Sequence, residues 1–314
     1  MMRWPGHPTL IPGESLSSWL RRIGIVYGLS VNELVKWGLG FQGMQTKSLD
    51  RSPPAKLVEA ISARTGAGVE TVRKATFSGV LPFLFDSAGK DDTEPASASR
   101  ICSLGSGLSK GIPWFRKQQA RRVTVCRLCF VNYPDAAQLL IWQLAILQSC
   151  PMHSLMLEPA QIEGDSVTWL NDKAEQAPEV VSSFDSRTWA AVTEGCVQLP
   201  GGIVDTGKWF WLLRVTHRNL KRPTMRNGRK EWQEIVCQRC PKILYARRTQ
   251  SNPARRWAIV LATALDLMEN GHMELIGRGD FQLSSSMYRG SIFSGVAPEK
   301  LKKEADRWNR WSSC

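Results

Sequence analysis

The sequence predicts a mainly α-helical protein with an N-terminal helix-turn-helix-like helical head, a central Cys3His zinc-binding module and a helical, basic C-terminal half. Three observations support this fold class. Apolar residues recur at helical spacing through the first quarter of the chain, two short pairs of metal-binding residues stand near the middle, and Lys and Arg concentrate in the C-terminal half. A chain of 314 residues is long enough for two or three small domains.

Composition shifts along the chain predict four segments. Residues 1–85 form the helical domain, and residues 86–113, rich in Ser, Gly, Ala and Asp, form a linker. Residues 114–165 form the zinc-binding module, and residues 166–314 form the C-terminal domain. We therefore expect the helical head to be separated from the metal module by a polar connection.

The head begins with a predicted helix pair over residues 14–39. Leu16, Trp19 and Ile23 recur on one helical face, and the segment 28–30 breaks and restarts the helix. Ser30 is the expected N-cap, because Glu33 three residues later completes a capping box.

A second helix pair is predicted between Leu57 and Phe77, with its turn at residues 65–68. The spacing is compatible with a helix-turn-helix whose second helix presents Thr71, Arg73 and Lys74 outward. Helix pairs of this spacing are also common packing units, so DNA reading by this pair is one of two interpretations.

The central motif is Cys126-x2-Cys129 followed by Cys150-x2-His153. Three thiolates and one imidazole suit Zn2+, and two loops that each present two ligands can close a tetrahedral site without an open position for water. The sequence therefore predicts one structural Zn2+ per chain. The apolar run 139–147 between the pairs is predicted to be a buried helix.

Further helices are predicted at about 186–196, about 204–220 and from Pro298 onward, with a short strand at 167–170. Cys237-x2-Cys240 precedes a Trp-led apolar segment, like the first Cys pair, and this predicts a decayed internal copy of the zinc module. A second metal at Cys237 and Cys240 would need distant ligands such as Cys196, His217 or His272.

The net charge of +13 is concentrated in one stretch. Between Arg214 and Arg256, thirteen basic residues minus two acidic ones leave +11, which predicts nucleic-acid binding through phosphates, although a solvated surface that only keeps the protein soluble is the alternative. The expected contacts are Arg218, Lys221, Arg222, Arg226, Arg229, Lys230, Arg247, Arg248, Arg255 and Arg256.

Other classes of protein are disfavoured by what the sequence lacks. No apolar run is long enough to span a bilayer and no signal-peptide pattern opens the chain, so we expect a cytoplasmic protein without a membrane. No nucleotide loop, acidic metal cluster or nucleophile with a base at recognisable spacing is visible, so we expect a protein that is not an enzyme.

Two separate segments carry a family resemblance. The run from Cys126 to Leu155, with its C-x2-C, a Trp-containing apolar segment and C-P-x-H, resembles the zinc-binding core of the TniQ/TnsD family of transposition proteins. The opening Pro12–Ile23 segment, followed by Gly28-Leu-Ser30, resembles the N-terminal signature of the same family. Family members often carry another C-x2-C after the His-Leu segment, and here Met156 to Asp165 has no cysteine.

The resemblance implies a non-catalytic target-selection adaptor. Such proteins mark an insertion site and recruit an AAA+ ATPase, which recruits the transposase. They recognise target DNA directly or attach, as a homodimer, to an RNA-guided CRISPR effector. The alternative is a zinc-containing DNA- or RNA-binding transcriptional regulator with a similar head and metal module.

Overall fold

The computed structural model describes residues 3–43, 46–81, 115–116, 122–133, 137–163, 166–170, 173–200, 202–220 and 253–269. These residues fall into two compact units, and neither unit is continuous in sequence. The first contains the described residues of Met1–Pro82, Phe115–Leu144 and Leu155–Gln176. The second contains those of Phe83–Trp114, Ala145–Ser154 and Ala177–Cys314. The linker predicted at 86–113 lies outside the described residues.

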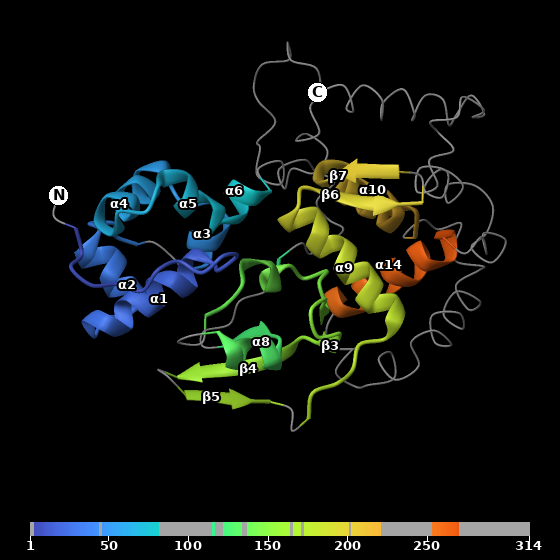
Figure 1. The fold of residues 1–314 in the computed structure, drawn as a ribbon, viewed down its shortest axis with the longest axis horizontal. Helices are drawn as coiled ribbons and strands as arrows, with labels where there is room; N and C mark the ends of the chain where they lie inside the picture. The colour runs from blue at the N-terminus through green and yellow to red at the C-terminus, as the bar shows by residue number, and fades with distance from the viewer. Residues whose placement is uncertain are drawn as a thin grey trace, which may run out of the picture. The chain divides into compact units, whose positions relative to one another are not determined.

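The first unit begins with a series of helices, drawn in blue and cyan in Figure 1. They are α1 (Leu16–Tyr27), α2 (Val31–Glu33), the π-helix η1 (Leu34–Gly38), α3 (Thr46–Arg51), α4 (Ala55–Thr65), α5 (Val69–Lys74) and α6 (Phe77–Val80). Their buried apolar side chains form one hydrophobic cluster that includes Leu16, Trp19, Leu57, Ile61 and Val72. The helical spacing of these residues in the sequence therefore corresponds to a real core.

The break between α1 and α2 is built as the sequence predicts. Gly28 ends α1 with φ of 66°, a left-handed conformation that glycine adopts without steric cost. Ser30 caps α2, and its capping box with Glu33 is complete in both directions. Gly24 allows the turn to approach closely, because a Cβ atom there would lie 2.4 Å from the carbonyl oxygen of Leu29.

Helices α4 and α5 form the second predicted pair. They are joined by the short segment 66–68, in which Gly66 has φ of 76°. Ile61 and Val72 are fully buried, whereas Thr71, Arg73 and Lys74 are exposed. The exposed side of α5 is therefore the side that the sequence predicts.

The first unit also contains a three-stranded antiparallel sheet that the sequence patterns did not predict in full. Its strands are β1 (Arg122–Val125), β4 (Glu158–Glu163) and β5 (Ser166–Trp169), in the order β1-β4-β5. Val125 pairs with Glu158, and Ala160 pairs with Trp169. Figure 1 shows β4 and β5 side by side. The prediction of a short strand at 167–170 corresponds to β5.

The predicted helix at 139–147 is wrong. Only the 3-10 turn η5 (Leu140–Gln143) is helical, although the run is buried. Its backbone forms hydrogen bonds with distant segments instead: the N–H of Leu140 donates to the carbonyl of Gly13 at 2.8 Å, and Gln143 accepts from the N–H of Arg116 at 2.8 Å. A continuous apolar run is compatible with either a buried helix or a buried extended segment, and here long-range pairing decides.

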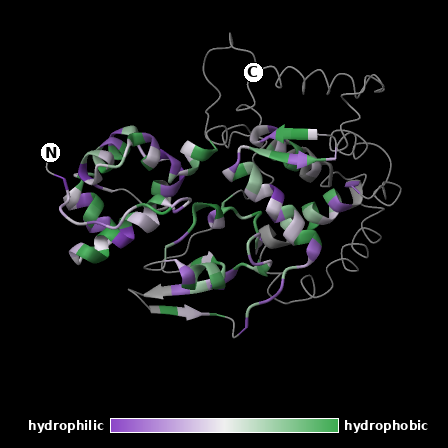
Figure 2. Cartoon of the chain, in the orientation of Figure 1, coloured by the Kyte–Doolittle hydropathy of each residue, from purple (hydrophilic) through white to green (hydrophobic). Residues whose placement is uncertain are grey.

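The second unit contains α9 (Glu179–Thr193), the hairpin strands β6 (Cys196–Leu199) and β7 (Gly202–Asp205), α10 (Thr206–Leu220) and α14 (Pro253–Glu269). The helix predicted at about 186–196 therefore begins seven residues earlier and ends before Cys196, which lies in β6. The hairpin was not predicted. In Figure 2, α9 carries both hydrophobic and hydrophilic residues, as expected for a helix with one buried side.

The two Trp-led segments differ in structure, which removes one of the similarities on which the prediction of an internal copy rested. Trp257 lies in a seventeen-residue helix, α14, whereas Trp142 lies in a four-residue 3-10 turn. The predicted tail helix from Pro298 lies outside the described residues.

Candidate metal centre

The first cysteine pair stands at the start of a short helix. Strand β1 leads into Cys126, which is the N-cap residue of α8 (Arg127–Asn132), and Cys129 lies in the first turn of that helix. The N–H of Phe130 donates to the carbonyl of Cys126 at 2.9 Å. Because residues three apart lie on the same side of a helix, the two thiols are presented together.

The second pair is presented by a tight turn. Cys150 ends the short strand β2 (Ser149–Cys150), and strand β3 (Leu155–Met156) follows the turn. The N–H groups of His153 and Ser154 both donate to the carbonyl of Cys150, at 3.3 and 2.8 Å. Ser154 has φ of 50°, and among the described residues it is the non-glycine residue with a positive φ. This unusual backbone conformation closes the turn that carries His153.

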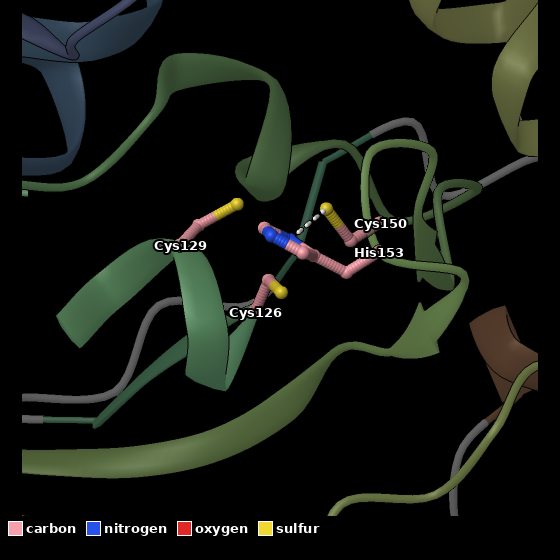
Figure 3. Close-up of side chains that lie close together, drawn as sticks. All are labelled: Cys126, Cys129, Cys150 and His153. Carbon is pink, nitrogen blue, oxygen red and sulfur yellow. Dashed lines mark hydrogen bonds between the residues drawn. The ribbon is translucent and has the colours of Figure 1, made fainter. Parts of the chain in front are cut away.

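The four predicted ligands come together. One donor atom from each of Cys126, Cys129, Cys150 and His153 lies within 4.8 Å of the others, and Figure 3 shows the side chains gathered around a common point. The three cysteines are buried and form no disulfide, and His153 Nδ1 lies 3.6 Å from Cys150 Sγ.

The arrangement fits a metal ion. A tetrahedral site with metal–sulfur bonds of about 2.3 Å has edges of roughly 3.8 Å, and the four donor atoms here all lie within 4.8 Å of one another. Three thiols and one imidazole can supply all four donors of such a site. Among the described residues this is the group of His, Cys, Asp or Glu that could hold a metal ion.

The first ligand pair is supported by a buried acid on β4. Arg127, between the two cysteines, donates to Glu158 at 2.9 Å, and its guanidinium lies 4.7 Å from the centre of the Trp169 ring. Burial raises the pKa of Glu158 above its usual value, and the ion pair with Arg127 opposes that shift. Arg127 thereby ties the start of α8 to the sheet.

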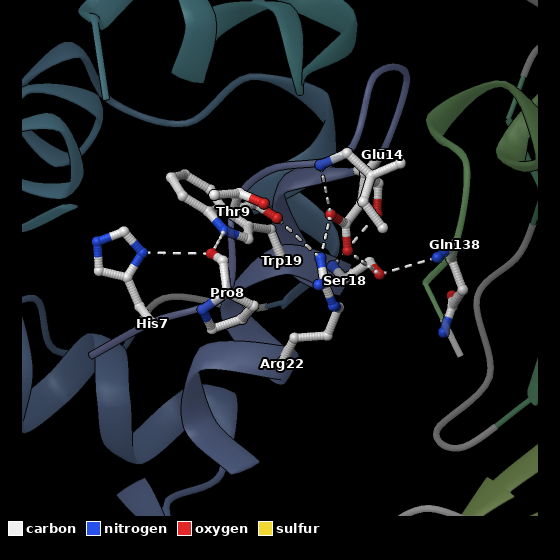
Figure 4. Close-up of polar contacts among 10 residues, drawn as sticks. His7, Pro8, Thr9, Glu14, Ser18, Trp19, Arg22 and Gln138 are labelled. Carbon is white, nitrogen blue, oxygen red and sulfur yellow. Dashed lines mark hydrogen bonds and ion pairs between the residues drawn. The ribbon is translucent and has the colours of Figure 1, made fainter. Parts of the chain in front are cut away.

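A buried polar network in the N-terminal segment was missed from the sequence. Arg22 donates to Glu14 at 2.8 Å, Ser18 Oγ donates to the same carboxylate at 2.8 Å, and the N–H of Gln138 donates to Ser18 Oγ at 2.9 Å. Figure 4 shows this connection, together with Trp19 donating to the carbonyl of Pro8. The network joins the N-terminal segment to the chain just before η5.

Burial dominates the electrostatics of this network. It raises the pKa of Glu14 above its usual value, against the lowering effects of the Ile11 N–H, Ser18 and Arg22. The signal in the sequence was the spacing of Glu14, Ser18 and Arg22 at intervals of four residues, which places all three on one side of α1 and its entry.

A second buried carboxylate reinforces the connection. Asp50 on α3 accepts from the N–H of Ser17 at 2.6 Å, from Ser17 Oγ and from the amide of Gln143 on η5. Burial raises the pKa of Asp50, and the three donors oppose that shift. Segments far apart in the sequence are thus joined at both ends of η5.

The remaining predicted site residues are not brought into this centre. Arg218 lies in α10, and Arg255 and Arg256 lie in the first turn of α14. On α5, Arg73 forms an exposed ion pair with Glu70 at 2.8 Å. The other basic contacts and the two additional cysteines lie outside the described residues, namely Lys221, Arg222, Arg226, Arg229, Lys230, Cys237, Cys240, Arg247 and Arg248.

The described residues are mainly helical, with a small antiparallel sheet and a Cys3His cluster whose three cysteines are buried. Residues 5–157 match the model of the TniQ family, and over this part the chain is a TniQ-family protein. The match includes the polar network at Glu14 and all four residues of the cluster. The domain indicates a transposition-associated role. Neither the curated proteins nor the solved structures gave a match.

Within the part of the chain that the structure describes, no helix has both the length and the apolar character required to cross a membrane.

Proposed function

We propose that the cluster holds one structural Zn2+ ion through Cys126, Cys129, Cys150 and His153. The donor set supports zinc, because thiolates and imidazole together suit a borderline-soft ion without redox chemistry. The burial of the three cysteines supports a structural role, since a catalytic zinc keeps one position open to water or substrate. The ion would then join two segments of chain that are more than twenty residues apart.

We further propose that the protein is a transposition target-selection adaptor that recruits an AAA+ ATPase and, through it, the transposase. The observation that carries this proposal is the family match over residues 5–157. An adaptor without chemistry of its own acts by holding two partners at once, which raises the local concentration of one at the other. Target DNA or an RNA-guided CRISPR effector would be the second partner.

If a neighbouring gene encodes an AAA+ ATPase, purified full-length protein should retain that ATPase in a pull-down, and target DNA or effector complex should increase the yield. The intact chain is required, because the first unit combines Met1–Pro82 with Phe115–Leu144 and a cut between them would divide it. An ATPase from an unrelated transposon serves as the control. Equal retention of the two ATPases would contradict the adaptor role.

The basic stretch from Arg214 to Arg256 is proposed to bind nucleic acid through phosphates. Its thirteen basic residues support this, since each neutralised phosphate releases counterions. Reversing the charge of Arg247, Arg248, Arg255 and Arg256 should weaken DNA binding at 50 mM salt. The slope of log affinity against log salt concentration should fall by the contribution of about four phosphate contacts. Fluorescence anisotropy at several salt concentrations measures both, and an unchanged slope would assign the stretch another role.

A zinc-containing transcriptional regulator is the second candidate function, and one observation favours it. The exposed Thr71, Arg73 and Lys74 on α5 follow the short turn 66–68 between α4 and α5, a spacing compatible with a helix-turn-helix. Sequence-specific DNA binding that is lost in Lys74→Ala, without any ATPase retention, would favour the regulator.

A further inference from the structure

Helix α9 contacts the residues that precede and follow the second ligand pair in the sequence. Asp185 on α9 is fully buried, and its Oδ2 accepts from the N–H of Gln148 at 3.0 Å, the N–H of Ser149 at 2.6 Å and the hydroxyl of Ser149 at 2.6 Å. These donors belong to the two residues immediately before Cys150. One turn earlier on the same helix, Ser182 donates to Ser154, the residue after His153, at 3.3 Å.

These contacts use the Oδ2 atom of Asp185 as a hydrogen-bond acceptor at that place. A buried charge is costly unless hydrogen bonds compensate it, and backbone N–H groups that donate to an ionised oxygen form stronger bonds than neutral pairs do. Three donors on one oxygen therefore fix the peptide planes of residues 148 and 149, and with them the direction in which Cys150 leaves β2. The carbonyl of Ser154 also accepts from Ala177 at 2.8 Å, which ties the far end of the turn to the start of α9.

Helix α9 is itself held within the second unit. Phe184 packs against Trp209 of α10 with ring centres 6.0 Å apart, and Arg187 forms two hydrogen bonds to Glu269 of α14, at 2.9 and 2.8 Å. Helix α9 lies beyond residue 157, where the family match ends. The support of Cys150 and His153 therefore comes from a part of the chain outside the matched domain.

We propose that Asp185 is a positioning residue for the metal site, acting through the backbone before Cys150, so that metal affinity depends on helix α9. This inference rests on the proposal that the cluster binds Zn2+. Residues that orient metal ligands commonly account for a 10- to 100-fold difference in metal affinity. Ser182 performs the corresponding role at the other end of the turn.

The test measures the Zn2+ affinity of the full chain by competition with a chromophoric chelator, and the Co2+ absorption spectrum of the same proteins. Asp185→Ala should weaken Zn2+ binding by about 10- to 100-fold and change the thiolate charge-transfer bands of Co2+. Asp185→Asn keeps an acceptor oxygen of the same shape and should lose less, about tenfold. Arg187→Ala, which alters the contact of the same helix with α14, is the control and should stay within about threefold of the parent.

The outcomes separate the two proposals. If the parent binds Zn2+ and both Asp185 variants match the control in Zn2+ affinity and Co2+ spectrum, the positioning role of Asp185 is wrong. The zinc site itself is not contradicted by that result. Parent protein that binds neither metal overturns both. If Asp185→Ala is not folded by circular dichroism, the comparison of Asp185→Asn with Arg187→Ala decides in the same way.

Discussion

Purified protein is expected to contain one Zn2+ per chain, and Cys150→Ser is expected to lose both the metal and most of the folded protein. Structural zinc contributes on the order of 10 kcal/mol in small zinc-binding peptides, and a whole domain is usually stable by only about 5–15 kcal/mol. Removing one ligand therefore removes an amount comparable to the total. Elemental analysis gives the metal content, and urea unfolding gives the stability.

Cys196→Ser is the matched control for this experiment. Cys196 is a free cysteine in strand β6 and is not part of the cluster, so its replacement should leave one Zn2+ per chain. Treatment of the parent with a strong chelator should reproduce the loss of stability seen in Cys150→Ser. Soluble, folded Cys150→Ser with a full complement of zinc would overturn the assignment of the ligands.

Glu14→Gln is expected to lower the free energy of unfolding by about 3–5 kcal/mol, because it leaves the charge of Arg22 buried without its partner. Only 4% of the Arg22 side chain and none of that of Glu14 is exposed, so water cannot replace the lost interaction. The double variant Glu14→Gln with Arg22→Met should lose less than the sum of the two single variants, since it removes the unpaired charge.

The ion pair between Arg73 and Glu70 provides a control with the same N–O distance of 2.8 Å. Its side chains are 49% and 74% exposed, so Arg73→Ala should cost no more than about 1 kcal/mol. Urea unfolding of the full chain at neutral pH compares all of these variants. A loss below about 1 kcal/mol for Glu14→Gln would show that the buried pair does not hold the N-terminal segment in place.

The four residues of the cluster could be predicted from the sequence because short-range spacing determines each pair. Two residues three positions apart are brought together by either a helical turn or a tight loop. Cys126 and Cys129 lie at the first turn of a helix, and Cys150 and His153 lie in a tight loop. The capping box at Ser30 and Glu33 was predictable for the same reason, since it depends on four consecutive residues.

Features that depend on long-range pairing could not be predicted in this way. The apolar run around Leu140 predicts a helix when only its neighbours are considered. The N–H of Leu140 instead donates to the carbonyl of Gly13, more than a hundred residues earlier. Asp185 is one acidic residue among many in the sequence. Its role arises only from the packing of α9 beside residues 148 and 149. The family match likewise identifies the domain but leaves this contact outside its range.

The adaptor role is tested most directly by mapping insertions in cells that express the transposase and the AAA+ ATPase with or without this chain. Insertions are expected to concentrate at the target only when the intact chain is present, and Cys150→Ser should behave like its absence while Cys196→Ser behaves like the parent. Insertions that concentrate at the same target without the chain would contradict it.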